Sequence, residues 1–147
     1  MKIKQQGFTL IELVVVITIL GILAAFALPR FAGLEVDARK ATVDGLAGSV
    51  RAASALAHSL QLAQAKSTGE PVTMEGQVVT MVERYPTSDS PGIQSSLQDI
   101  TGFTGVAAGS DWRFEKTGAT TPASCSVLYA AAAAGGSPTI TPTKTGC

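Results

Sequence analysis

The stretch that decides the fold runs from Gly7 to Pro29 and reads GFTLIELVVVITILGILAAFALP. Its last seventeen residues carry no charge, and the apolar run reaches twenty-two residues when it is extended back to Phe8. A helix that crosses a bilayer needs roughly 17–25 such residues. Glu12 is the exception, because an acidic side chain at membrane depth is costly and normally marks a function. No basic residue lies near it in the sequence, so we expect its partner to come from another molecule.

Two lysines, Lys2 and Lys4, precede Gly7, and the sequence Phe-Thr-Leu-Ile-Glu-Leu follows it. This arrangement resembles the amino terminus of the type IV pilins and of the related pseudopilins of type II secretion. The resemblance implies that residues 1–7 are a leader peptide that a membrane prepilin peptidase removes by cutting between Gly7 and Phe8. It also implies that Phe8 is then N-methylated and that Glu12 becomes the fifth residue of the processed chain.

An ordinary secretory signal peptide is the alternative for the same segment, since Ala25-Phe26-Ala27 fits an A-x-A cleavage site. Against it, Glu12 would lie within the hydrophobic core, and the apolar segment is longer than the usual 7–15 residues. A secreted enzyme or binding module behind such a signal would need a catalytic or binding constellation, and the sequence offers none.

Length and composition predict one domain and give no support to nucleic-acid binding, catalysis or metal binding. The chain has 147 residues, with eleven basic and eleven acidic side chains and 15% charged residues. Removing Lys2 and Lys4 leaves nine basic against eleven acidic residues, a balance that does not predict a nucleic-acid partner. We predict no enzyme activity, no cofactor and no metal site, because CxxC, HExxH and Cys/His clusters are absent. The single histidine, His58, is expected to be a solvated helix residue.

The helix is predicted to continue beyond Pro29 as an amphipathic segment ending near Lys66, stopped by Gly69 and Pro71. Apolar residues recur at spacings of three and four, at Val43, Leu46, Val50, Ala53, Ala57 and Leu60. The positions beside them are polar and are expected to face water: Lys40, Asp44, Arg51, Ser54, His58 and Gln61. Residues 8–29 are therefore predicted as a transmembrane and filament-core stalk, and residues 30–147 as a head that includes the second half of the helix. Gly21 and Pro29 are predicted as a helix break, since similar pilins can unwind there.

Beyond residue 71 the pattern changes to short strands separated by turns. Strands are predicted at 72–74, 77–82, 111–115 and 125–130, with an edge strand at 138–143, a short helix at 90–99 and a loop at 131–136. The predicted fold class is α+β, with the second half of a long N-terminal helix packed on a small antiparallel sheet. Asp89, Asp99 and Asp111 lack regular ligand spacing and are predicted to be solvated loop acids.

Cys125 and Cys147 are the two cysteines of the chain. In an exported protein a disulfide is their expected state, and closing this loop would contribute about 3 kcal/mol in the chain-entropy model. Together with Tyr85-Pro86 and Asp111-Trp112, this terminal disulfide loop resembles pilins of the mannose-sensitive haemagglutinin type.

The resemblance implies a structural subunit of an extracellular type IV pilus for adhesion, surface attachment or motility. It would be stored as a single-pass precursor in the bacterial inner membrane and polymerised with copies of itself by the inner-membrane assembly machinery. Glu12 would pair during assembly with the amine of Phe8 in a neighbouring subunit. The alternative within the family is a pseudopilin of a type II secretion system, a class that generally lacks the terminal disulfide.

Overall fold

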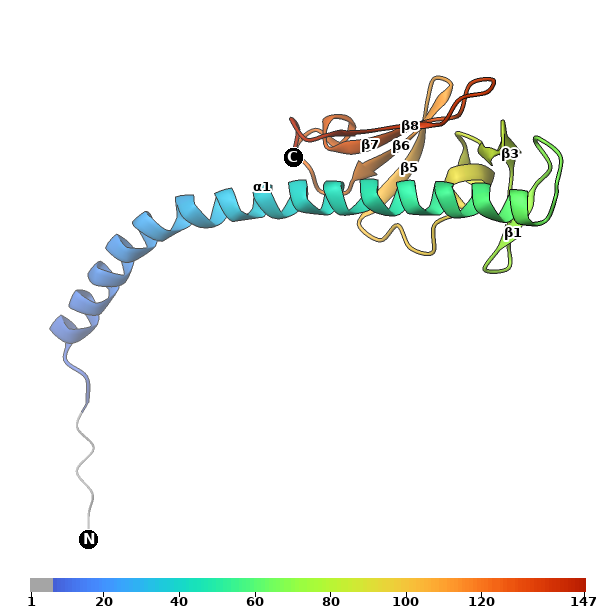
Figure 1. Cartoon of the computed structure of the whole chain (residues 1–147). Coiled ribbons are helices and arrows are strands. Elements are labelled where there is room, and N and C mark those ends of the chain that lie inside the picture. The colour runs from blue at the N-terminus through green and yellow to red at the C-terminus, as the bar shows by residue number, and fades with distance from the viewer. Residues whose placement is uncertain (1–6) are drawn as a thin grey trace, which may run out of the picture. The chain divides into compact units, whose positions relative to one another are not determined.

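A computed structural model describes residues 7–147, apart from the side chains of residues 30–32, and consists of one long helix followed by short strands (Figure 1). Helix α1 runs from Leu10 to Ala63 and contains 54 residues. The chain divides into two compact units, of which the first extends through Asp37 and the second comprises Ala38–Cys147. α1 contributes residues to both units, and the strands belong to the second.

α1 continues without interruption through Gly21 and Pro29 in the isolated chain. Proline removes one backbone N–H donor, but membrane helices tolerate it because local adjustments satisfy the freed carbonyl. Glycine only lowers helix propensity. Unwinding between these residues within a filament stays a prediction.

The end of α1 differs from the predicted stop. The helix ends at Ala63, and Ala65 follows in the left-handed region with φ 51°. The N–H of Ala65 donates to the Leu62 carbonyl and that of Lys66 to the Gln61 carbonyl. These two bonds form a Schellman motif, in which glycine usually takes the left-handed position. The helix therefore stops six residues before Gly69, because the backbone reverses at Ala65.

The main sheet has four antiparallel strands in the order β5-β6-β7-β8. They are β5 (Phe103–Ala108), β6 (Asp111–Lys116), β7 (Ser126–Ala130) and β8 (Thr139–Thr143). Two small hairpins precede them: β1 (Val72–Met74) with β2 (Gln77–Val79), and β3 (Met81–Val82) with β4 (Tyr85–Pro86). The predicted α+β class, the β6, β7 and edge β8 strands and the loop after β7 are confirmed. β5 was not predicted, because its sequence FTGVAA lacks clear alternation.

Two other local predictions were wrong. The strand expected over 77–82 is interrupted at Thr80, which separates β2 from β3. The helix expected over 90–99 is a single π-turn, η1, over Ser90–Gln94. Its N-cap is Asp89, whose carboxylate accepts from the Gly92 N–H at 2.7 Å. Asp89 was expected to be solvated, and it instead satisfies a donor at the start of this turn.

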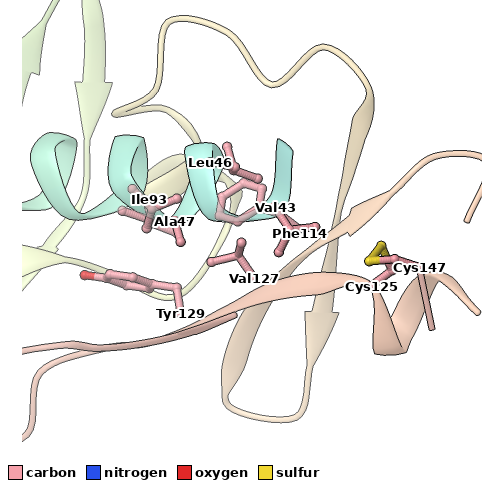
Figure 2. Packing of buried hydrophobic residues seen from close by; sticks show 10 residues of the cluster. Val43, Leu46, Ala47, Ile93, Phe114, Cys125, Val127, Tyr129 and Cys147 are labelled. Atoms are coloured by element: carbon pink, nitrogen blue, oxygen red, sulfur yellow. A yellow bond between two sulfur atoms is a disulfide. The ribbon is translucent and has the colours of Figure 1, made fainter. Parts of the chain in front are cut away.

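The main core lies between α1 and the sheet, where Val43, Leu46 and Val50 meet Phe114, Val127 and Tyr129 (Figure 2). A second cluster joins Ala57 to the β1–β2 hairpin and β3 through Val72, Met74, Val79 and Met81. The predicted apolar stripe is therefore largely correct, whereas the predicted polar face is confirmed at Asp44 and Arg51 and wrong at two other positions. Ser54 and Gln61 are buried within the stripe. Gln61 is tolerated there because its amide donates to the carbonyls of Ser67 and Glu70.

Cys125 and Cys147 form the predicted disulfide. The segment that this bond closes includes β7 and the edge strand β8. Pro142 in β8 has no N–H to donate, and the Arg51 guanidinium of α1 donates to the Ile140 carbonyl at 3.3 Å. The disulfide loop is thus attached to the helix as well as to the sheet.

Candidate functional site

The start of α1 is built by a reciprocal pair of hydrogen bonds between Thr9 and Glu12. The Glu12 carboxylate Oε2 accepts from the Thr9 backbone N–H at 2.9 Å and from the Thr9 hydroxyl at 2.7 Å. The Glu12 N–H donates to the same hydroxyl oxygen at 3.3 Å. This is a capping box, in which a threonine before the helix and a glutamate three residues later satisfy each other's orphan donors.

This role of Thr9 was not predicted, although the spacing Thr-x-x-Glu before an apolar run is the signature of a capping box. The expectation that Glu12 has no partner in its own chain needs correction in the same respect. Its carboxylate has neutral partners from Thr9. What those donors do not supply is a countercharge.

Glu12 lies within an apolar surface. On its side of the helix, Phe8, Ile11, Val15 and Val16 surround a shallow depression. Phe8 is 91% exposed and Leu10 80% exposed, and the large apolar side chains from Leu13 to Leu28 are exposed as well. This part of α1 is long and apolar enough to cross a membrane, and none of the apolar window is buried within the chain. Such a surface requires lipid or another protein to cover it.

The electrostatics of the helix start favour an anion. A helix amino terminus carries about half a positive elementary charge, which stabilises a carboxylate in the first turn and disfavours an amine there. Glu12 is the acidic residue of that first turn. The capping box therefore holds a negative charge at a fixed place on the helix, where it can bind a cation from another molecule.

Gly7 and Phe8 lie in exposed, non-helical chain directly before the capping box. A side chain at Gly7 would meet nothing within 4 Å, so the fold places no demand on this glycine. Lys2 and Lys4 lie outside the described residues. The bond between Gly7 and Phe8 thus lies in accessible, non-helical chain. Gly21 and Pro29 lie further along the same helix and away from this site.

His58 is not the solvated residue that the sequence suggested. Its ring stacks on Tyr85 with centroids 4.3 Å apart and an angle of 6° between the planes. Its Nδ1 lies 2.9 Å from the Arg84 carbonyl and must carry the proton, since a carbonyl can only accept. The imidazole therefore attaches the β3–β4 hairpin to α1. Among the described residues no cluster of three or more His, Cys, Asp and Glu side chains could hold a metal ion.

Comparison with known proteins places these features in a family. Residues 2–28 match the model of the prokaryotic N-terminal methylation motif. The type IV narrow pilus major component PilA5 of Thermus thermophilus is 54% identical over 54 residues, which cover 37% of this chain and 47% of that protein. The type IV major fimbrial protein FimA of Dichelobacter nodosus is 42% identical over 79 residues, covering 51% and 45%. The match thus spans just under half the length of these two relatives.

A longer match is found with the fimbrial protein EcpC of Eikenella corrodens, which is 33% identical over 112 residues, covering 74% of this chain and 71% of that protein. No solved structure matches the chain significantly. The methylation motif, the apolar helix with its early glutamate and this longer similarity agree, and the chain belongs to the type IV pilin family.

Proposed function

We propose that this chain is a structural subunit of an extracellular type IV pilus. The observation that carries the proposal is the exposed apolar half of α1, which begins with a capped carboxylate and is not covered by other parts of the chain among the described residues. Lipid can cover this surface before assembly, and the same segment of other copies can cover it afterwards. The relatives support the proposal, since they are named as major pilus or fimbrial proteins.

In this proposal the precursor is held in the bacterial inner membrane by α1 and is processed at the Gly7–Phe8 bond by a prepilin peptidase. Cleavage removes residues 1–7 and leaves a basic amine on Phe8, which N-methylation keeps basic. That amine lies at the positive end of its own helix, where the helix dipole disfavours it. The Glu12 carboxylate of a neighbouring subunit would neutralise it and would also gain the countercharge that Thr9 does not supply.

Energetics favour such a pairing once water is excluded. A lone buried charge costs several kcal/mol, and a well-formed pair recovers much of that cost. The pair would also fix the axial position of an incoming subunit, because uncharged helices can slide along each other. The assembly machinery of the inner membrane would deliver the subunit, and the role of the chain in the filament would be structural rather than catalytic.

Two measurements test this function. The intact mass of the chain from surface filaments should correspond to Phe8–Cys147 with one added methyl group and the disulfide formed. A chain that starts after Ala27 would instead show an ordinary signal peptide and would contradict the proposal. The second measurement is the protein composition of sheared surface filaments, in which this chain should be abundant. Its absence from filaments in cells that make the mature chain would favour a different role.

A further inference from the structure

The disulfide loop ends in a short segment, Lys144–Cys147, that contacts the helix as well as the sheet. Lys144 Nζ lies 3.0 and 2.9 Å from the two carboxylate oxygens of Asp44. The Arg39 guanidinium donates to the Cys147 carbonyl at 2.9 Å. We call Lys144–Cys147 the clasp segment.

The clasp segment is also fixed to the neighbouring loop. The Gly146 N–H donates to the Ser124 carbonyl at 2.9 Å, and the Gly146 carbonyl accepts from the Thr121 N–H at 3.1 Å. A side chain at Gly146 would lie 2.6 Å from the Thr121 carbonyl oxygen, so only glycine permits this close approach. The next residue, Cys147, and its disulfide partner Cys125 are buried in the main core, which also contains Val43 and Phe114 (Figure 2).

The contacts with α1 fall at the beginning of the second unit, which starts at Ala38. Arg39 and Asp44 are five residues apart and enclose Val43, whose side chain is fully buried. The clasp segment therefore covers the first turns of the helix that pack on the head.

These contacts are weak individually. The side chains of Lys144 and Asp44 are 40% and 53% exposed, and ion pairs at such exposed sites contribute little because water screens them. A covalent closure strengthens them, because it keeps both partners close together and raises their effective concentration. The disulfide between Cys125 and Cys147 supplies this closure three residues from Lys144.

The later turns of α1 are held differently. Ala57 packs in the second cluster against the β1–β2 hairpin, and His58 and Gln61 bond to loop carbonyls. None of these contacts involves the clasp segment or the disulfide. The turns of α1 near Arg39 and those near Ala57 are thus held on the head by separate sets of contacts.

We propose that the disulfide-closed clasp segment determines where the head begins to hold α1. With the disulfide intact, the helix is held from about Arg39. When the disulfide is opened, the turns from Arg39 to Ala47 detach from the sheet more readily, while the turns around Ala57 stay in place. Opening is a two-electron reduction: an added dithiol such as dithiothreitol becomes a cyclic disulfide, and Cys125 and Cys147 become two thiols.

Hydrogen exchange of the full chain in detergent micelles, read by mass spectrometry, tests this proposal. In the double variant Cys125→Ser/Cys147→Ser, and in the wild type after reduction with dithiothreitol, amides of residues 39–47 should exchange at least 10-fold faster. Amides of residues 55–61 should change by less than 2-fold. Equal protection of residues 39–47 in the wild type and the double variant would overturn the proposal, as would a uniform loss of protection along residues 39–61.

Variants that keep both cysteines test the clasp segment itself. Lys144→Ala and Gly146→Ala should each accelerate exchange at residues 39–47 by roughly 3-fold or more. Thr145→Ala is the matched control, since Thr145 is exposed between them, and should have no effect. The charge-reversed pair Asp44→Lys with Lys144→Asp should restore protection that either single reversal loses. Failure of the double reversal to restore it, or an equal effect of Thr145→Ala, would show that these contacts do not hold the helix.

Discussion

At the scale of single residues, the hydrogen bonding and the charge of the Glu12 carboxylate are separate properties. Its carboxylate already has two donors from Thr9, so it is not an unsatisfied group. Its charge, in contrast, is not neutralised by those donors. The capping function and the proposed assembly function can therefore be separated by mutation.

We predict that Glu12→Ala and Glu12→Gln are both cleaved and folded but enter filaments poorly. Glutamine can replace glutamate in a capping box, so Glu12→Gln keeps the bonds to Thr9 while removing the charge. The measurement is the ratio of filament-borne to total mature chain. Wild-type filament yield from Glu12→Gln would show that capping alone matters, and a block at cleavage would place the role of Glu12 in peptidase recognition.

Tyr129 provides a second test at this scale. Its hydroxyl donates to the Pro86 carbonyl at 2.7 Å, and its side chain is fully buried. Burial raises the pKa of Tyr129 to about 12 from its usual value of 10.0, because the charged form is disfavoured in the core. The folded state then binds this proton more tightly than the unfolded state does. The resulting stability is complete below pH 10 and is lost as the pH rises through 12.

We therefore expect the free energy of unfolding to fall between pH 10 and 12 by about 2 kcal/mol through this residue. Tyr129→Phe should be less stable at pH 8 by about 1–2 kcal/mol, since the Pro86 carbonyl loses its donor, and should show a flatter dependence above pH 10. Urea unfolding at a series of pH values measures both effects. Tyr85→Phe is the control, and an unchanged slope in Tyr129→Phe would refute the assignment.

At the scale of elements, the two small hairpins show how tertiary contacts override local preference. In both, the two loop residues adopt positive φ angles, as a type I′ turn requires. The β1–β2 loop uses Glu75-Gly76, which places glycine at one of these positions. The β3–β4 loop uses Glu83-Arg84, with φ values of 46° and 68° and no glycine. His58 compensates from α1 by bonding the Arg84 carbonyl and stacking on Tyr85.

We predict that Glu83→Asn with Arg84→Gly stabilises the chain by about 1 kcal/mol, because Asn-Gly adopts these backbone angles with little strain. Thermal unfolding of the full chain in micelles measures the change. The control, Glu83→Gln with Arg84→Lys, alters the side chains but keeps two non-glycine residues at positive φ. The midpoint temperature of its thermal unfolding should therefore not rise. A fall in the midpoint of the Asn-Gly variant would show that the native side chains matter more than the backbone angles.

Elements also show where sequence reasoning succeeded. The spacing from Val43 to Leu60 predicted the buried side of α1, and alternation predicted β6. The π-turn at Ser90 and the strand β5 could not be read from local preference. β5 can pair with β6 because Gly105 has no side chain. Atoms of the Gln94 and Trp112 side chains lie within 3 Å of the position that a β-carbon at residue 105 would occupy. Ser54 and Gln61 were misplaced because polar helix residues were expected to face water, whereas the Gln61 amide donates to the carbonyls of the loop that follows α1.

At the scale of the whole molecule, the class of the protein was readable from its first thirty residues, and the processing steps stay predictions. The narrower resemblance to mannose-sensitive haemagglutinin pilins also stays a prediction. The disulfide is confirmed, and its loop includes two of the four strands of the main sheet. A single covalent bond therefore closes half of the main sheet and the clasp segment into one loop.

We predict that Cys147→Ser loosens the disulfide-closed part of the head, by up to about 3 kcal/mol in the chain-entropy model, and lowers both chain abundance and filament yield without blocking cleavage. Immunoblots of cell extracts and of sheared filaments report abundance and yield, and the intact mass reports cleavage. Cys125→Ser should behave alike, because either change leaves one free thiol. Unpaired thiols at both positions in native filaments would contradict the assignment.

The outer edge of β8 has a consequence for how copies of this chain can aggregate. Exposed strand edges invite unwanted pairing between molecules, a hazard for any protein concentrated in a membrane before use. Pro142 offers no donor to an approaching strand, and the Ile140 carbonyl is occupied by Arg51. This edge is therefore a poor template for amyloid-like growth, which favours self-association through the apolar half of α1 over misassembly through β8.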